Sequence, residues 1–188
     1  KFNEQWATGI LFHSNYLNSQ IDHNHDHFLD IPLKKQLNGL WRLIHTSDDL
    51  HLEFNVQGII DNRFGGQTAK VFERHNTPVP NRLYEISNNT RRLEVFGKVG
   101  YMGFDNPLQS VAVVYGATVH EQKASFGDNP YSGLQRGFYT NLIFQSPLTA
   151  NLKHNLNAVA TYRFDDFTEA FSDVNSSRIE QQSSLFAE

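Results

Sequence analysis

Alternation of apolar and polar residues along eight short segments is the feature that most constrains the fold of this 188-residue chain. In the clearest segment, residues 50–57, the even positions are apolar and the odd positions are polar. The apolar set is Leu50, Leu52, Phe54 and Val56, and the polar set is His51, Glu53, Asn55 and Gln57. A period of two belongs to a strand with one apolar and one wetted face. Its repetition predicts an all-β fold, and specifically the wall of an antiparallel transmembrane β-barrel.

Connections of alternating length separate the predicted strands. The strands are expected at residues 5–19, 36–45, 50–60, 91–103, 109–123, 136–144, 153–164 and 178–187. Longer connections are expected at 20–35, 61–90, 165–177 and, of medium length, at 125–135, and shorter ones at 46–49, 104–107 and 146–151. Outer-membrane barrels have short periplasmic turns, long extracellular loops and aromatic girdles. The pattern therefore predicts that the four longer connections face the outside of the cell, and aromatic residues near the strand ends agree with it.

Composition excludes several classes of protein. The net charge is -4 and the charges are scattered, so no Lys and Arg cluster suggests a nucleic-acid partner. The absence of cysteine excludes disulfides, thiolate metal sites and cysteine nucleophiles. The longest apolar run, residues 111–115, is far below the roughly 20 residues that a membrane-spanning helix needs. A helical membrane protein is therefore excluded.

Both ends of the sequence lead us to expect a piece of a longer protein. Residues 1–4 contain no initiator Met, and no basic region or apolar signal segment follows. Residues 183–188 stop inside an expected strand, without a turn or a polar tail. We therefore expect residues 1–188 to be one β-barrel segment.

The sharpest local signal is the segment 22–30, which we call the Asp-rich loop. Side-chain oxygens stand at alternate positions in this loop, followed by the backbone carbonyl near Phe28 and a final carboxylate. The candidate metal ligands are Asp22, Asn24, Asp26 and Asp30. Such spacing folds oxygen atoms around one hard cation, which predicts Ca²⁺ as a cofactor. His27 is a departure, because calcium loops of this kind normally have glycine in a left-handed conformation at that turn position.

Two other interpretations of the Asp-rich loop stay open. His23, His25 and His27 could bind Zn, Cu or Ni, or a metal-containing substrate, with the aspartates assisting. Alternatively, the loop is a solvated connection whose Asx residues only make turns. The sequence does not separate these three interpretations.

The connection predicted over 61–90 contributes two further candidates for substrate binding, Arg63 and His75, beside the three histidines of the Asp-rich loop. Its Gly65-Gly66-Gln67 step indicates a backbone turn. A phosphate-binding loop would need more glycines and a following helix.

No group of residues supports catalysis. Glu53, Glu94 and Glu121 stand at alternating strand positions, where a wet barrel interior or simple solvation explains them. No nucleophile elbow of the G-x-S-x-G kind occurs. The sequence therefore predicts a protein that is not an enzyme.

Residues 20–38, which read QIDHNHDHFLDIPLKKQLN, resemble a stretch in the barrel of TonB-dependent outer-membrane receptors of the Bacteroidetes. In those receptors an Asp-rich loop with Phe-Leu-Asp leads into the next strand, and a Gly-Gly-Gln step follows one hairpin later. Trp41-Arg42 and Gly65-Gly66-Gln67 stand where that pattern expects them, and the segments 125–141 and 162–167 are also similar. The resemblance covers most of the chain, and residues 22–38 are its specific part.

This resemblance implies a 22-stranded barrel, closed by an amino-terminal plug, in the outer membrane of a Gram-negative bacterium. It implies active import of an iron-siderophore, haem, cobalamin or another large nutrient, with energy passed on by TonB through the plug. The chain contains no plug, no TonB-contacting segment and no carboxy-terminal aromatic strand. The expected partners are therefore outer-membrane lipid, the imported substrate and, through a plug missing from this sequence, TonB.

Two alternatives remain beside the receptor. Eight strands could close into a self-contained outer-membrane barrel with a structural or adhesive role. A soluble β-sandwich or lipocalin-like binder would have the same alternation, with its apolar face turned inward. Alternation alone does not tell the inside of such a sheet from its outside.

Overall fold

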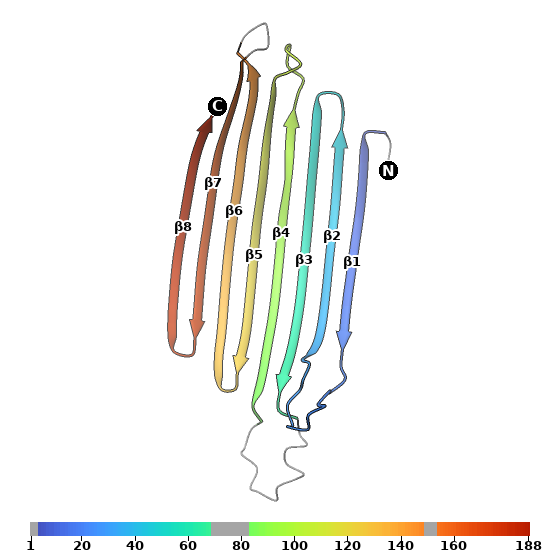
Figure 1. Ribbon diagram of the computed structural model, residues 1–188, viewed down its shortest axis with the longest axis vertical. Helices are drawn as coiled ribbons and strands as arrows, with labels where there is room; N and C mark the ends of the chain where they lie inside the picture. The colour runs from blue at the N-terminus through green and yellow to red at the C-terminus, as the bar shows by residue number, and fades with distance from the viewer. Residues whose placement is uncertain (1–3, 69–82, 149–153) are drawn as a thin grey trace, which may run out of the picture.

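The protein forms a single antiparallel sheet of eight strands in the computed structural model, which describes residues 4–68, 83–148 and 154–188 (Figure 1). The strands are β1 (Trp6–Leu17), β2 (Leu33–Thr46), β3 (Leu50–Gly66), β4 (Glu85–Tyr101), β5 (Ser110–Phe126), β6 (Asn129–Pro147), β7 (Asn155–Phe171) and β8 (Val174–Ala187). Each pairs with its neighbours in sequence order, as a meander. None of the described residues belongs to a helix that could cross a membrane. The predicted all-β class is confirmed.

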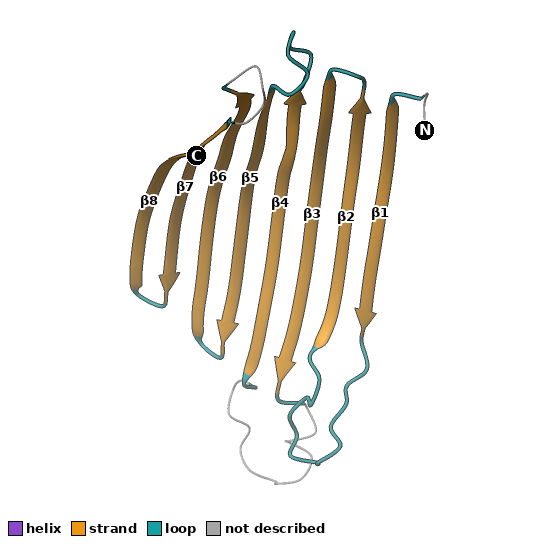
Figure 2. Cartoon of the chain, turned by 45° about the horizontal axis from the view of Figure 1, so that its top comes forward, coloured by secondary structure: helices purple, strands orange, loops and turns teal. Residues whose placement is uncertain are grey.

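The sheet is open, because within the described residues β1 pairs only with β2 and β8 only with β7. The strands lie side by side in one layer, and none of the described residues forms a second layer on either face (Figure 2). An open, single-layer antiparallel sheet is consistent with a segment of a β-barrel wall.

Strand register sorts the side chains onto two faces of opposite character. Val56 pairs with Trp41 and Val95, and the row runs on through Ala117 and Phe138. One residue further along β3, Gln57 lies in a row on the opposite face. This row has Leu11 and Leu40 on β1 and β2, and Glu94, Thr118, Gly137 and Asp165 on β4 to β7. Because neighbouring residues of a strand point to opposite faces, the two rows are back to back. We call these faces the apolar face and the polar face.

The apolar face forms a band that ends at charged residues. On β3 the band runs from Leu50 to Ile60, close to the 9 to 11 residues of a tilted transmembrane strand. On the neighbouring strands it is bounded, toward the 67–84 connection, by Arg91, Glu121, Arg136 and Asp166. Beyond this boundary the outward positions of β3, β4 and β5 are the polar residues Asn62, Asn89 and Lys123.

The apolar side chains of this sheet do not form a buried core. Among the described hydrophobic residues only Ala124 is buried, with 7% of its surface exposed. On the apolar face the exposed fractions are 77% for Ile10, 54% for Leu93 and 47% for Leu142. A soluble domain would cover such a face against a second layer, since apolar burial is its main source of stability.

Two of the predicted longer connections are wrong. The segments 125–135 and 165–177 are mostly strand, and the chain reverses in two tight turns, at Gly127-Asp128 and at Ser172-Asp173. The glycine at the first turn position adopts a φ of 61°, in the left-handed region that glycine enters without steric cost. The long connections that remain at this end of the sheet are 18–32 and 67–84.

The physical reason for this error lies at the end of the apolar band. Beyond Val119 the outward positions of β5 become Glu121 and Lys123, so the alternation of apolar and polar residues stops. Backbone pairing does not depend on that alternation, and it continues to Phe126. The predicted contrast of four long and three short connections therefore does not hold.

Candidate functional site

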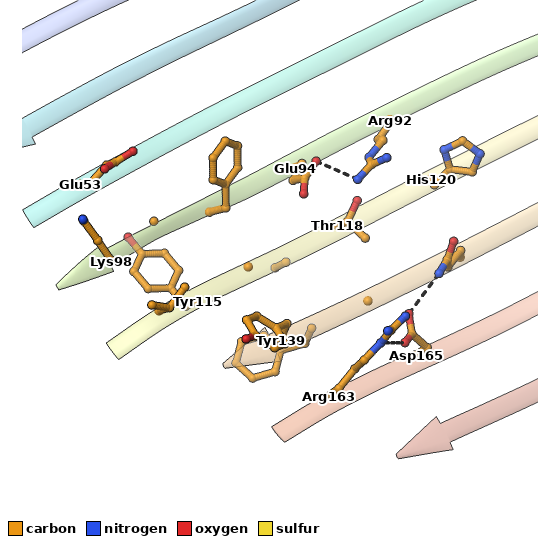
Figure 3. A pocket seen from close by; sticks show the side chains of 18 residues that line it. Glu53, Arg92, Glu94, Lys98, Tyr115, Thr118, His120, Tyr139, Arg163 and Asp165 are labelled. Atoms are coloured by element: carbon orange, nitrogen blue, oxygen red, sulfur yellow. Dashed lines mark hydrogen bonds and ion pairs between the residues drawn. The ribbon is translucent and has the colours of Figure 1, made fainter. Parts of the chain in front are cut away.

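The polar face contains a groove of about 800 Å³ across β3 to β7, which we call the polar groove (Figure 3). Each strand contributes side chains two residues apart, because these share a face. The polar and aromatic residues of this face that line the groove include Glu53, Arg92, Glu94, Lys98, Thr118, His120, Gln135, Tyr139, Arg163 and Asp165. The groove is thus built by strand register from residues far apart in the sequence.

Two ion pairs of the groove each join residues of a single strand. Arg92 Nη2 lies 2.9 Å from Glu94 Oε2 on β4, and Arg163 Nε lies 2.6 Å from Asp165 Oδ2 on β7. The side chain of Gln135 on β6 donates a second hydrogen bond to Asp165 Oδ1 at 3.0 Å. Figure 3 shows these two pairs at separate points of the groove. The pairing leaves the groove electrically balanced instead of strongly attractive to one sign of charge.

The most buried polar side chain of the sheet lies beside the groove. Asn55 is 2% exposed, and its amide donates to Glu53 Oε1 and to the carbonyl of Phe96, both at 3.2 Å. Glu53 also forms an ion pair of 2.9 Å with Arg42 of β2. Buried polar groups are stable only when they are hydrogen-bonded, and this amide and carboxylate meet that requirement. The cluster fixes the groove at its β3 side.

The arrangement of the groove suits weak, reversible contacts with a polar ligand. Its carboxylates are engaged by Arg, Gln or Asn, and the Thr118 hydroxyl donates to the Leu93 carbonyl at 3.5 Å, which leaves His120 and Tyr139 as groups that can exchange hydrogen bonds with a solute. The sequence analysis considered Glu53 and Glu94 singly and missed the groove. The period-two repeat of polar residues at 92 and 94, 118 and 120, and 163 and 165 was the available signal.

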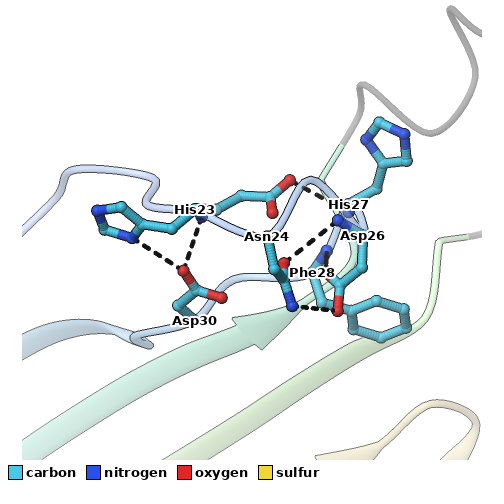
Figure 4. Close-up of polar contacts among 7 residues, drawn as sticks. His23, Asn24, Asp26, His27, Phe28 and Asp30 are labelled. Carbon is cyan, nitrogen blue, oxygen red and sulfur yellow. Dashed lines mark hydrogen bonds and ion pairs between the residues drawn. The ribbon is translucent and has the colours of Figure 1, made fainter.

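The Asp-rich loop folds on its own side-chain hydrogen bonds (Figure 4). Asp22 Oδ2 accepts from the backbone N–H of His27 at 3.1 Å. Asn24 Oδ1 accepts from the N–H of Asp26 at 3.3 Å, and Asp26 Oδ1 accepts from the N–H of Phe28 at 2.8 Å. These successive Asx turns curl the chain around the side of the loop that carries the oxygens.

His27 adopts the conformation expected for the glycine that it replaces. Its φ is 70°, and the φ of His25 is 59°, so both residues are in the left-handed region. Non-glycine residues held there are strained, typically by about 1 to 3 kcal/mol. The loop therefore makes its turn without glycine, at a cost in backbone strain.

The predicted metal ligands meet the needs of a cation only in part. Asp22 Oδ1 is buried and has no hydrogen-bond partner among the described residues. Within the same part of the chain, no three His, Asp or Glu side chains are placed to hold one metal ion. Asn24 Nδ2 donates to Asp26 Oδ2 at 2.9 Å, and Asp30 is turned toward His23. Oxygen atoms are available, but a cation would have to replace these hydrogen bonds.

Asp30 is held by His23 at the far side of the loop. The backbone N–H of His23 donates to Asp30 Oδ2 at 2.8 Å, and the ring Nδ1 of the same residue lies 3.0 Å from that oxygen. These contacts, the backbone hydrogen bond first, hold the pKa of Asp30 below its ordinary value. The carboxylate is therefore charged at neutral pH, and it is available as an anion.

The Asp-rich loop is docked against the start of the 67–84 connection. The N–H of Leu29 donates to the carbonyl of Gly66 at 2.9 Å, and the N–H of Thr68 donates to the carbonyl of His27 at 2.7 Å. Phe28 and Gln67 form an isolated β-bridge between these two bonds. The two long connections are thus tied together at one end of the sheet.

The predicted substrate-binding residues are not gathered into one site. His23 contacts Asp30, His25 is exposed, and His27 is half-buried. Arg63 lies near the end of β3 and forms an ion pair of 2.8 Å with Asp61. His75 lies outside the described residues. The described members line the loop end of the sheet, without a shared pocket.

Comparison with protein-family models, with curated proteins and with solved structures finds no match to this chain. The functional argument therefore depends on the sheet itself.

Proposed function

We propose that this chain is a wall segment of an outer-membrane β-barrel, with the 18–32 and 67–84 connections on the extracellular side. The observation that carries the proposal is the apolar face, which is exposed across the sheet while the opposite face is polar and ion-paired. A bilayer would cover that face without a second protein layer. A soluble sandwich or lipocalin-like binder is less well supported, because it would bury this face.

We further propose that the barrel is a TonB-dependent active transporter for a metal chelate, of the iron-siderophore, haem or cobalamin class, or for another large nutrient. Open edges at β1 and β8 favour a larger barrel over a self-contained eight-stranded one, which would pair these two strands. The resemblance of residues 20–38 to the barrel of TonB-dependent receptors supports the transporter class. The balanced polar groove supports it, because a lumen wall must release a polar solute as readily as it binds it.

Cysteine labelling tests the membrane part of the proposal, since these 188 residues contain no cysteine. Leu142 and Asn141 are neighbours on β6 and point to opposite faces. In protein reconstituted into vesicles, a cysteine at Leu142 should resist a water-soluble maleimide and one at Asn141 should react. Equal reaction of both cysteines would contradict a bilayer against the apolar face.

Uptake by intact cells tests the transport part. We expect that deletion of the gene abolishes uptake of labelled iron-siderophore, haem iron or cobalamin, and that the restored gene recovers it. Unchanged uptake of all three would remove metal-chelate import and leave another large nutrient or a structural role. The membrane proposal would survive that outcome.

We also propose that the Asp-rich loop binds Ca²⁺ through Asp22, Asn24, Asp26 and Asp30. The buried, unpartnered Asp22 Oδ1 and the left-handed turn at His27 support this proposal. Asp26→Ala should abolish the heat of Ca²⁺ binding in calorimetric titration, while Asp48→Ala, at the opposite end of the sheet, should not. Absence of heat with the unmodified protein, for both Ca²⁺ and Zn²⁺, would leave the loop as a solvated turn.

A further inference from the structure

The apolar face contains a groove of about 870 Å³ that crosses β1 to β5, which we call the apolar groove. Its floor is a pair of glycines, Gly39 and Gly58, which are cross-strand partners in the register of β2 and β3. A Cβ atom added at either position would meet no other atom within 4 Å. The glycines therefore leave open space on a face where the neighbouring positions carry large side chains.

Bulky apolar side chains form the walls of this groove. They are Phe12, Leu37, Trp41, Ile60 and Leu93. The indole of Trp41 is fixed in place, because its Nε1–H donates to Thr8 Oγ1 at 2.9 Å and its ring meets Phe54 edge-on at 5.9 Å. A fixed wall and an empty floor make a preformed channel, which suits a long, thin and apolar ligand.

The groove ends at a cationic group on the charged boundary of the band. Arg91 lines this end, and its cross-strand neighbour is Glu121. The carboxylate of Glu121 forms an ion pair of 2.7 Å with Lys123. Within the described residues no carboxylate lies within ion-pair distance of Arg91. Two cations therefore stand beside one anion, and a net positive charge remains at the mouth of the groove.

We propose that the apolar groove binds an acyl chain of an anionic membrane lipid, with the lipid phosphate against Arg91. The inference depends on the proposed membrane location. Charge complementarity selects the ligand, because the guanidinium of Arg91 suits a phosphate and the channel below it suits a hydrocarbon chain. An apolar protein segment could fill the channel but would leave the cationic end without an anion.

Bromine-labelled lipids test this proposal, since Trp41 is a fluorophore in the groove wall. The natural protein is reconstituted into vesicles of phosphatidylcholine that contain brominated phosphatidylglycerol or brominated phosphatidylcholine. The Trp41 signal is the difference from a Trp41→Phe variant. We expect brominated phosphatidylglycerol to quench Trp41 fluorescence as strongly as brominated phosphatidylcholine does at an about fivefold lower fraction of labelled lipid. One arginine beside an anionic lipid would give a preference of this size.

Two variants and two matched controls separate the groove from the rest of the face. Arg91→Gln should remove the preference for phosphatidylglycerol, and Gly58→Leu should weaken quenching by both lipids because its side chain fills the floor. Arg136→Gln removes a cation at the same boundary outside the groove, and Gly9→Leu adds a leucine on the polar face, where it also has open space. Neither control should change quenching.

Three outcomes would overturn the inference. These are equal quenching by both lipids, a preference that survives Arg91→Gln, or unquenched Trp41 together with a cross-linked oligomer, which would mean that protein fills the groove. If Gly58→Leu does not fold, the lipid preference of Arg91→Gln, compared with that of the natural protein, decides by itself. Failure of the protein to enter vesicles at all would contradict the proposed membrane location itself, and the two failures are therefore distinguishable.

Discussion

The two faces of this sheet are built from the same strands and differ by one residue in register. Around Val56 the apolar face contains apolar side chains on five successive strands, and around Gln57 the polar face contains Glu94, Thr118 and Asp165. On the polar face the groove carboxylates Glu53, Glu94 and Asp165 each form an ion pair with an arginine, whereas the apolar face has no charge until its boundary. The difference is consistent with a segment of a β-barrel wall, since none of the described residues forms a second layer over either face.

The largest expected effect comes from introducing an arginine at the centre of each face, because the two faces should tolerate the charge differently. Val56→Arg should lower the free energy of unfolding from a bilayer by about 2 to 4 kcal/mol, because arginine near the midplane loses its hydration. Gln57→Arg, on the opposite face, should cost less than about 0.5 kcal/mol. Leu52→Arg, nearer the edge of the band, should fall between them. Denaturant titration in vesicles measures all three, and equal costs for Val56 and Gln57 would contradict a lipid-facing side.

Two glycines on the apolar face should respond differently to an added methyl group. A Cβ at Gly97 would clash with the backbone carbonyl oxygen of Glu53 and would lie 2.9 Å from the hydroxyl of Tyr115. Gly97→Ala should therefore destabilise the protein by about 1 to 3 kcal/mol through overpacking. Gly58→Ala, with open space around it, should be neutral or slightly stabilising. The same unfolding titration checks both, and similar values would mean that the Glu53 backbone and Tyr115 do not crowd Gly97.

The sequence predicted the faces correctly because they depend only on local alternation. Leu50 to Gln57 fall on the sides that a period of two assigns to them, and every predicted strand has a counterpart. Strand ends were predicted less well. At Glu121 and Asp166 the alternation ends while backbone pairing continues, so hydrogen bonding, which the residue pattern does not report, sets where β5 and β7 end.

The two candidate sites also differ in how far they could be predicted from the sequence. The turns of the Asp-rich loop could be anticipated, because Asp22, Asn24 and Asp26 act on backbone groups within five residues of themselves. The polar groove could not, because Glu94 and Asp165 share a face only through the register of four strands. Sites built across strands need that register, and sites built along one loop do not.

The smallest expected effect concerns the ion pairs of the polar face. Asp165 is 16% exposed and is held by Arg163 at 2.6 Å and by Gln135 at 3.0 Å. Arg163→Gln should cost under about 1 kcal/mol, because water in the groove can replace the lost contact. A double-mutant cycle with Asp165→Asn measures the coupling between the two residues. A coupling of several kcal/mol would indicate a dry groove, as expected of a buried pair that loses one partner. A dry groove would not let a polar solute pass, so a small coupling is what a water-filled lumen requires.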